Sequence, residues 1–412
     1  MRRVVVFTVA ALLGVLVIGG ASAMVDRAAA PKKVAKTTVT LSGWASSPAE
    51  TAALRTTIRG FERSHPNYTV NYAPINGDYT AAMLAKFSAR KPPDVFYVDS
   101  NVAPDWMSQR VLAPLDSLIK KNHYNIKPFF PRLVQAFRYK GHIYGLPKDW
   151  SPLAMETNNA MMAKAGVKPP TTWGQLVTVA KKLKAANVVP GGQPVCIDPD
   201  WARMLAFIYQ NKGSFLNATK TRATLLTPAV RQAVNFYLGL QNQGLSGTHD
   251  KLGVGWCGEA LGKEKAAIIF EGNWVVGYMH DTFPNVGYKI SPMPKGKVNG
   301  NLGFTVSYSI GANTSNKAAA FKLLSYLTGP VGMRLWTAQG IALPSHKDVK
   351  IPAGRSSFIR QAGYAHAWQF APGFSKVIDT ANNELQSVFA GKETVDAMLV
   401  KVQAAANSAL GG

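Results

Sequence analysis

The sequence predicts an α/β protein with two lobes, and three observations support that prediction. The chain has 412 residues, which is more than one ordinary hydrophobic core accommodates. A strand at 38–41, a helix that begins near Pro48 and a strand at 69–72 form a βαβ unit, which implies a parallel sheet. The same alternation of strands and helices restarts after Pro147, so a second lobe is expected in the rest of the chain.

The first helix has a well-marked start and one apolar face. Ser47-Pro48-Ala49-Glu50 is typical of a capping box with proline in the first turn. Leu54, Ile58 and Phe61 follow at spacings of four and three residues, so they share one side of the helix. That side is expected to pack on the sheet.

Polar and aromatic residues follow the first strands of the predicted sheet. Trp44 and Ser46 come after the strand at 38–41, and Asp99 comes with Ser100 after the strand at 94–98. In open α/β sheets, ligands bind at the carboxyl ends of the strands. We therefore expect these residues to lie at a binding cleft. Asp94 precedes its strand, at the other edge, and is expected to be structural.

The stretch 141–159 is expected to cross between the lobes. It begins as a strand at 142–146 that Pro147 should stop, and Pro152 follows five residues later. Between the prolines, Asp149 and Trp150 form a polar and aromatic corner. An exposed tryptophan beside a carboxylate is what a carbohydrate cleft would need.

The second half of the chain continues with helices and short strands. Thr172 to Gln175 is a second capping box, and Thr227-Pro228 opens a further helix. Further elements are expected as strands at 266–270 and 304–310, a helix from 315 to 329, and two helices after Pro372.

The N-terminus has the pattern of an export signal. Three residues with two arginines precede the apolar run 4–20, and Ala21-Ser22-Ala23 is a typical cleavage site. Residues 1–23 are thus predicted to be a signal peptide or an uncleaved anchor, and 24–36 a disordered tether. No cysteine lies near residue 20, so a lipoprotein is not expected. The body of the protein is expected to be extracytoplasmic, that is, periplasmic or cell-surface associated.

The formal charge of +24 arises from 46 basic and 22 acidic residues. Nucleic acid is not an expected partner, because the basic residues are spread along the chain and the export signal removes it from nucleic acid. An anionic cell envelope or an acidic habitat accounts better for the charge. The only two cysteines, Cys196 and Cys257, are predicted to form a disulfide in an exported protein.

Tryptophans and carboxylates in loops are the candidate binding residues. Indole rings stack on the C–H faces of sugars, and carboxylates accept hydrogen bonds from hydroxyl groups. Each of these tryptophans could instead be a partly buried core residue, Glu271 could instead cap a helix, and Gly303 could serve either ligand approach or the crossover. The predicted ligand-binding set is Trp44, Ser46, Asp99, Trp150, Trp201, Glu271, Trp274 and Gly303.

Five segments, taken in order, resemble the extracellular solute-binding proteins of ABC importers, of the maltose/maltodextrin-binding type. They are PPDVFYVDS (92–100), GHIYGLPKDW (141–150), AGVKPPTTWGQLVTVAKKLK (165–184), ALGKEKAAIIFEGNW (260–274) and the run from GFTVSYSI to Pro344. By position, Trp44, Trp201 and Trp274 match family segments that line the sugar cleft.

The resemblance implies a two-lobed, periplasmic-binding-protein-like fold (type II) with the ligand cleft between lobes joined by crossover hinges. Lobe one would comprise 37–147 plus 311–350, and lobe two 148–310 plus 351–412. It also implies capture of a mono- or oligosaccharide by a monomer, without catalysis, cofactor or metal. The partners would be the membrane permease subunits of an ABC importer with their cytoplasmic ATPase.

Other functions stay open at this level. Asp99 and Glu271 could be the carboxylate pair of a glycosidase, although the sequence has no nucleophile motif, metal cluster or phosphate loop. The same fold could bind a polyamine or iron. It could also present its ligand to a receptor as a sensor, which sequence cannot separate from transport.

Overall fold

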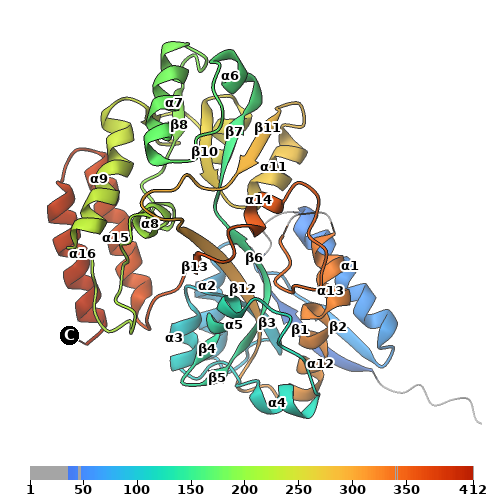
Figure 1. The fold of residues 1–412 in the computed structure, drawn as a ribbon. Coiled ribbons are helices and arrows are strands. Elements are labelled where there is room, and N and C mark those ends of the chain that lie inside the picture. Colours follow the sequence, from blue (N-terminus) through green and yellow to red (C-terminus); the bar gives the residue numbers. More distant parts are fainter. Residues whose placement is uncertain (1–35, 45–47, 339, 341, 412) are drawn as a thin grey trace, which may run out of the picture. The chain divides into compact units, whose positions relative to one another are not determined.

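The structure is a computed structural model, and it describes residues 36–44, 48–338, 340 and 342–411 (Figure 1). The predicted export signal at 1–23, the tether apart from Lys36, and Ser46 lie outside the described residues. The chain from Lys36 to Gly412 forms one compact unit. A search of the described helices found none with the length and apolar character needed to cross a membrane.

The first sheet has six strands: β1 (Thr37–Ser42), β2 (Tyr68–Tyr72), β3 (Val95–Asp99), β6 (Gly145–Pro152), β12 (Asn301–Ile310) and β13 (Ala365–Ala367). Their order is β13-β12-β3-β1-β2, and β6 also pairs with β12. β1 is parallel to both β2 and β3, as the βαβ unit predicted. β12 is antiparallel to β3 and β6, so a strand from late in the chain completes the sheet.

The second sheet has five strands: β7 (Ala154–Asn158), β8 (Gln193–Cys196), β9 (Ser246–Gly247), β10 (Ala266–Glu271) and β11 (Tyr288–Ser291). Their order is β11-β7-β10-β8-β9. β7 is antiparallel to both of its neighbours, whereas β10, β8 and β9 run parallel. A separate hairpin consists of β4 (Arg138–Tyr139) and β5 (His142–Ile143).

The prediction that a strand ends at Pro147 is wrong. β6 continues from Gly145 to Pro152 along β12, and the register shifts where Pro147 and Asp149 face Ser307 and Val306. The strand tolerates its prolines because β6 pairs only with β12 in this sheet, so a missing N–H need not interrupt a second ladder. The bulge at this point changes the direction in which the corner side chains project.

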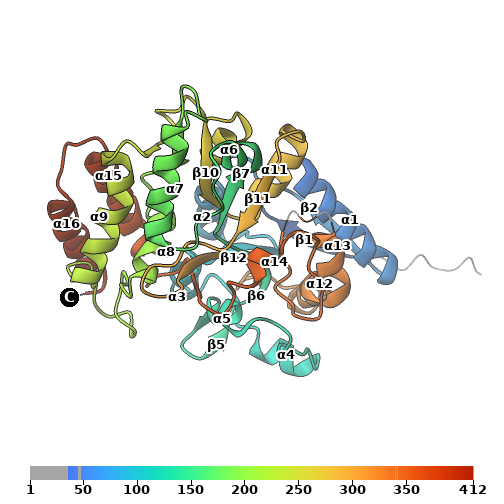
Figure 2. The same cartoon turned by 45° about the horizontal axis from the view of Figure 1, so that its top comes forward.

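Helices cover both sheets, and those at the C-terminus form a separate group. α1 packs on α12 and α13 beside the first sheet, while α16 packs on α9 and α15 (Figures 1 and 2). The helices whose apolar residues belong to, or pack against, the hydrophobic cluster of the first sheet are α1 (Pro48–Ser64), α2 (Tyr79–Ser88), α3 (Ala103–Ser108), α4 (Asp116–Lys121), α5 (Pro131–Gln135), α12 (Lys317–Thr328) and α13 (Pro330–Thr337). The others are α6 (Asn159–Lys164), α7 (Trp173–Ala185), α8 (Trp201–Gln210), α9 (Pro228–Asn242), α10 (Cys257–Gly262), α11 (Trp274–Thr282), α14 (Ser356–Ile359), α15 (Phe374–Phe389) and α16 (Val395–Ala409).

Helix starts follow the predicted capping residues wherever they are described. The Thr172 side chain accepts from the N–H of Gln175, and Thr227 caps α9 in the same way. α1 begins at Pro48, but Ser47 of its predicted capping box lies outside the described residues. The Gln175 side chain reaches the N–H of Thr171 rather than that of Thr172, one residue before the position that a capping box would use.

Two large hydrophobic clusters lie in the two halves of the molecule. One contains Val39, Val98 and Leu324 with the helices of the first sheet, and the other contains Ile268 and Phe207 with the helices of the second. The predicted lobe boundaries remain a prediction. β6 and β12 pair within the first sheet, although most of each strand falls in the range predicted for lobe two.

The two cysteines form a disulfide between the end of β8 and the start of α10. Cys196 and Cys257 are 61 residues apart in sequence, and their Cα atoms are 5.5 Å apart. Closing a loop of this length stabilises a folded chain by roughly 4 kcal/mol in the chain-entropy model. The bond holds the start of α10, and with it the neighbouring Trp256, against the second sheet.

Candidate functional site

A cavity of about 600 Å³ brings together aromatic and charged residues from distant parts of the chain. Its walls come from the residues after β1, from α1, β3, β6, β12 and α13, and from α11. Five tryptophans take part in the lining: Trp44, Trp150, Trp256, Trp274 and Trp336. The charged groups of the lining are Glu50, Asp99, Lys148, Asp149 and Asp281.

Trp44 is held at the end of β1 by two tyrosines. Its ring makes edge contacts with Tyr79 at 5.2 Å and with Tyr97 at 5.0 Å between centroids. The residue is only partly buried, and it lines the 600 Å³ cavity and an adjoining cavity of about 400 Å³. The expectation that Trp44 borders a pocket at the carboxyl end of its strand agrees with this position.

Trp274 lies in the first turn of α11, and its indole N–H already donates a hydrogen bond within the protein. Its Nε1–H donates to the Glu271 carboxylate at 2.9 Å, and its ring meets Phe304 edge-on at 5.2 Å. A Cβ on Gly272 would lie 2.2 Å from the indole, so only glycine lets the ring fold back this closely. The free surface of Trp274 is therefore its apolar ring.

Trp256 is positioned in a similar way on the neighbouring helix. It precedes Cys257, its ring contacts Tyr278 at 4.8 Å, and a Cβ on Gly258 would lie 2.1 Å from it. Like Trp274 it is partly exposed. The disulfide and this glycine thus place a second indole at the cavity.

Lys148 occupies the bulge of β6 as a buried cation. Its ammonium group contacts Asp149 and lies 3.7 Å from a Glu50 oxygen. It also sits 3.8 Å from the ring centre of Trp336 and 4.7 Å from that of Tyr97. Two carboxylates and two aromatic faces compensate the desolvation of this charge.

Asp149 is fixed by a further partner, because the Trp336 Nε1–H donates to its carboxylate at 3.0 Å. Trp336 itself is only 3% exposed, but it also borders the cavity. Sequence reasoning missed Trp336 as a cavity residue, because it stands on the buried face of α13. Lys148, by contrast, stands in the corner that the sequence singled out.

Asp99 ends β3 and accepts a hydrogen bond from the N–H of Asn101 at 3.0 Å. Burial raises the pKa of this carboxyl from its usual 3.8 to about 6. It lines both the 600 Å³ and the 400 Å³ cavity. Asp94, at the start of the strand, accepts from the N–H and hydroxyl of Thr40, so it is structural as predicted.

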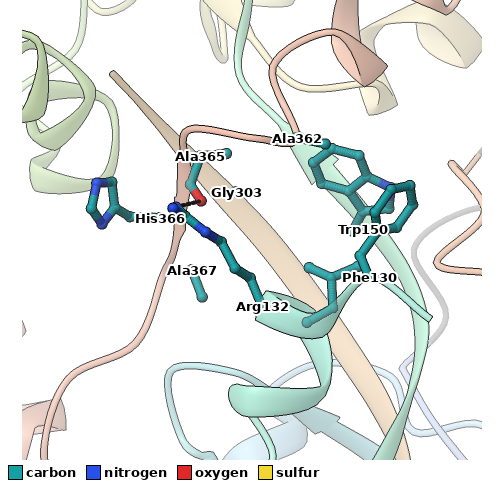
Figure 3. A pocket seen from close by; sticks show the side chains of 9 residues that line it. Phe130, Arg132, Trp150, Gly303, Ala362, Ala365, His366 and Ala367 are labelled. Atoms are coloured by element: carbon teal, nitrogen blue, oxygen red, sulfur yellow. Dashed lines mark hydrogen bonds between the residues drawn. The ribbon is translucent and has the colours of Figure 1, made fainter. Parts of the chain in front are cut away.

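Trp150 is not the exposed residue that the sequence suggested. It is 3% exposed, and its Nε1–H donates to the carbonyl of Pro344 at 3.2 Å. Its ring nevertheless borders the 600 Å³ cavity on one side and a small enclosed space on the other, which Gly303 also lines (Figure 3). Trp150 is buried because β12 and the segment around Leu343 both cover it.

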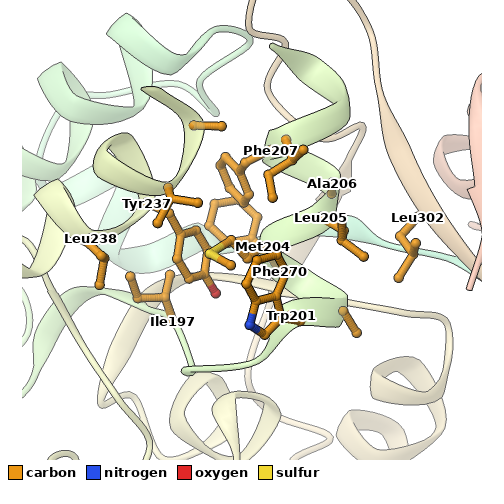
Figure 4. Close-up of a cluster of buried hydrophobic side chains, with 14 of the residues drawn as sticks. Ile197, Trp201, Met204, Leu205, Ala206, Phe207, Tyr237, Leu238, Phe270 and Leu302 are labelled. Atoms are coloured by element: carbon orange, nitrogen blue, oxygen red, sulfur yellow. The ribbon is translucent and has the colours of Figure 1, made fainter. Parts of the chain in front are cut away.

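Trp201 does not reach the cavity, and its predicted role there is wrong. The residue has no exposed surface and packs edge-on against Phe215 in the large cluster of the second half (Figure 4). Its Nε1–H donates to the carbonyl of Ala381 at 2.7 Å. Asp200 caps α8, so Trp201 lies in the first turn of a largely buried helix rather than in an open loop.

Glu271 is a buried partner of Arg203 rather than a free acceptor at the large cavity. It is 1% exposed, and its carboxylate accepts from Arg203 at 2.7 Å and from Trp274. Burial raises the pKa of Glu271, and the Arg203 charge opposes that rise. Neither predicted role, hydroxyl binding or helix capping, describes these contacts. Arg203 also pairs with Asp200.

The Arg203 group borders a third cavity of about 360 Å³, whose lining includes Asp198, Asp200 and His249. Trp256 lines both this cavity and the 600 Å³ cavity. Trp44 and Asp99 in turn join the 600 Å³ cavity to the 400 Å³ one. The three spaces therefore form a series with shared walls.

The sequence matches the model of a known protein family. A family model of bacterial extracellular solute-binding proteins matches residues 44–334. The chain belongs to this family. A binding protein of Brucella abortus (strain 2308) is 26% identical to it over 370 residues, which are 85% of this chain and 88% of that relative.

Solved structures of solute-binding proteins share the fold. A Listeria monocytogenes ABC substrate-binding protein in complex with cycloalternan has a TM-score of 0.82 at 21% identity, over 91% of this chain and 99% of that protein. UgpB from Mycobacterium tuberculosis in complex with glycerophosphocholine has a TM-score of 0.78 at 18% identity, over 90% of this chain and 98% of that protein. The predicted periplasmic-binding-protein-like α/β fold is confirmed, and the family is one of binding proteins.

Proposed function

We propose that this solute-binding protein captures a carbohydrate in the 600 Å³ cavity and delivers it to the membrane permease of an ABC importer. The single observation that carries the proposal is the gathering of tryptophans in that cavity. The described indole N–H groups of Trp150, Trp274 and Trp336 already donate to protein acceptors. The partly exposed rings of Trp44, Trp256 and Trp274 offer a ligand apolar surface, which suits the C–H faces of a sugar.

The polar groups of the cavity complement those rings. Asp99, Asp149 and Glu50 present carboxylate oxygens, which accept hydrogen bonds from sugar hydroxyl groups. Lys148 is fixed between two of them and lines the same wall. A charged pair held by neighbouring rings is preorganised, so little side-chain entropy is lost when a ligand binds.

The series of cavities favours an oligosaccharide over a monosaccharide. The central space has walls in common with spaces of about 400 Å³ and 360 Å³ on its two sides. Tryptophans line the shared walls, and each one offers a ring to a separate sugar unit. The Listeria monocytogenes protein of similar fold was solved in complex with cycloalternan, which supports the same ligand class.

Capture would proceed by movement of the two lobes without chemistry. Ligand favours the closed form only through contacts that the open form lacks. The family is extracellular, in agreement with an exported chain that acts outside the cytoplasm. The closed form would then be recognised by the permease subunits, which the cytoplasmic ATPase drives.

A cationic solute is the second candidate, because acidic groups outnumber basic ones in the cavity. Its lining contains Glu50, Asp99, Asp149 and Asp281 but only one cation, Lys148. UgpB, which has a similar fold, was solved with glycerophosphocholine, whose choline group is cationic, and this supports the second candidate. Lys148 nevertheless neutralises part of this charge, and this favours the sugar over a cationic solute.

A thermal-shift screen of the full chain tests both candidates. We expect maltose-type or other oligosaccharides to raise the unfolding midpoint in a saturable way, with polyamines and ferric iron as controls. A shift with polyamines alone would replace the sugar by the cationic solute. If titration calorimetry on the same panel detects no sugar binding at millimolar concentration, the carbohydrate proposal is wrong.

A further inference from the structure

A second large cavity lies away from the one assigned to sugar. It has a volume of about 650 Å³ and is lined by α5, by the end of α8, by the loop that follows α8, and by the segment 366–370. The lining sets of the two cavities have no residue in common. A separate small space (Figure 3) shares Trp150 with the sugar cavity, and it shares Arg132 and His366 with the second cavity.

The charged groups of this second cavity all have the same sign. Arg132, Lys212 and Lys220 line it, and its lining contains no aspartate or glutamate. None of these three cations makes an ion pair within the described part of the chain. In the sugar cavity, by contrast, the cation Lys148 is paired with carboxylates.

Neutral contacts hold two of these cations at the cavity. Arg132 donates one N–H to the carbonyl of Ala365 at 3.1 Å, as Figure 3 shows. The Lys220 ammonium donates to the Gln369 side chain at 3.1 Å and to the carbonyl of Phe370 at 3.3 Å. Burial lowers the pKa of the Lys220 ammonium, and no described carboxylate pairs with it.

Aromatic residues complete the walls. His366 stacks on Tyr209 with ring centres 4.1 Å apart and an angle of 21° between planes. Phe215 and Phe370 line the cavity as well. Apolar and aromatic surface next to uncompensated positive charge suits an organic ligand with an anionic group, and the volume is in the range of small-molecule sites.

We propose that this cavity binds a ligand that carries a phosphate group, held by Arg132, Lys212 and Lys220. Three cations match the double charge of a phosphate better than the single charge of a carboxylate. The guanidinium of Arg132 offers two parallel N–H donors to phosphate oxygens, and lysines bind phosphate as point charges. The phosphate could belong to a soluble ester or to the head group of a lipid.

The test is titration calorimetry of the full chain with glycerol 3-phosphate and with inorganic phosphate, in a buffer without other phosphate. Vesicle sedimentation with phosphatidylcholine, alone or mixed with phosphatidylglycerol, measures the lipid source. Lys212→Gln and Arg132→Gln remove one charge each from the cavity. Lys322→Gln removes one exposed charge from α12, outside the cavity lining, and is the matched control.

We expect saturable binding that Lys212→Gln weakens about tenfold or more, because charge-assisted hydrogen bonds contribute about 1.5–3 kcal/mol. Lys322→Gln should leave it unchanged. Binding of glycerol 3-phosphate assigns a soluble ester. Binding only to vesicles with phosphatidylglycerol, weakened more by Lys212→Gln than by Lys322→Gln, assigns a lipid head group.

Three results would overturn the proposal. One is the absence of saturable binding to any of the probes. Another is an equal effect of Lys212→Gln and Lys322→Gln, which would show attraction by net charge alone. The third is loss of phosphate binding in Trp274→Ala, which would move the ligand to the sugar cavity. Arg132→Gln also removes the bond to Ala365, so unfolding midpoints of all variants are measured in parallel.

Discussion

Trp201 and Trp274 each stand at the first position of a helix, and their surroundings are opposite. Trp201, in the first turn of α8, has no exposed surface, and its N–H bonds the carbonyl of Ala381. Trp274, in the first turn of α11, borders the sugar cavity, and its N–H bonds the Glu271 carboxylate. The same residue type at the same helix position is core in one case and candidate ligand surface in the other.

The difference follows from how much of each helix is covered. In α8 eight residues are buried, and α15 and β12 pack against it. In α11 only Val275, Val276 and Met279 are buried, so one side remains open. Gly272 then lets the Trp274 ring fold back toward the cavity. Position in a helix thus says little about the role of an aromatic side chain until the packing of that helix is known.

The largest expected effect concerns Trp201, which tests the core side of the comparison. Trp201→Ala should lower the free energy of unfolding by about 3–5 kcal/mol, because a large buried ring leaves a cavity. Urea unfolding measures this loss. The fraction that stays folded should bind sugar with unchanged affinity. A large loss of affinity in folded protein would return Trp201 to the ligand site.

The next effect concerns Trp274, on the ligand side of the comparison. Trp274→Ala should weaken sugar binding by about 1–3 kcal/mol, because ring surface that stacks on the ligand is lost. Calorimetry against the sugar found in the screen measures it. Trp173→Ala is the matched control, since Trp173 stacks on Phe236 at 4.2 Å and does not line the cavity. Equal affinities of the two variants would remove Trp274 from the site.

A test of Asp99 examines the polar wall of the cavity independently of the Trp274 ring. Its pKa of about 6 means that the carboxyl becomes ionised as pH rises through 6. If the ionised form accepts ligand hydroxyl groups, affinity should rise between pH 5 and 7 by at most about tenfold. Asp99→Asn should abolish this dependence. Calorimetry at several pH values measures the profile, and an unaltered profile in Asp99→Asn would assign it to another group.

The same pKa shift makes the stability of the ligand-free protein fall as pH rises, whereas ligand affinity is expected to rise. The folded pKa of Asp99 lies above its usual value of 3.8, so the folded state holds this proton more tightly than the unfolded state. Its stabilising contribution is present below pH 3.8 and is lost as pH rises through 6. Ligand-free stability should therefore decrease over the range in which ligand affinity increases.

The smallest expected effect isolates the hydrogen bond of Trp274. Trp274→Phe keeps an aromatic face but removes the N–H that donates to Glu271. We expect a loss of about 0.5–1.5 kcal/mol in stability, the usual net contribution of one hydrogen bond, and a smaller loss of affinity than with Trp274→Ala. Thermal unfolding with calorimetry tests this. If both substitutions weaken binding equally, the orientation of the indole matters more than its area.

Local patterns determined much of the fold. The βαβ unit, the helix starts at Thr172 and Thr227, and the late strand at 304–310 all follow from capping residues and hydrophobic periodicity, which act over a few neighbouring residues. Asp94 and Asp99 were distinguished correctly because the two ends of a strand in a parallel sheet face different edges. The prediction that a strand ends at Pro147 was wrong because a proline is tolerated wherever no partner strand needs its N–H. Strand pairing is not a local property of the sequence.

The sequence by itself determined the class of fold and the family, and it pointed to tryptophans and carboxylates as the candidate ligand surface. Tertiary structure alone decided which side chains reach that surface. Trp201 is buried because α15 covers its helix. The Glu271 carboxylate accepts a hydrogen bond from Arg203, which lies 68 residues earlier in the chain. Lys148 and Trp336 both line the cavity because side chains of β6 and α13 contact each other there. Burial and ion pairing depend on contacts between distant segments, and a pattern of neighbouring residues carries no information on those contacts.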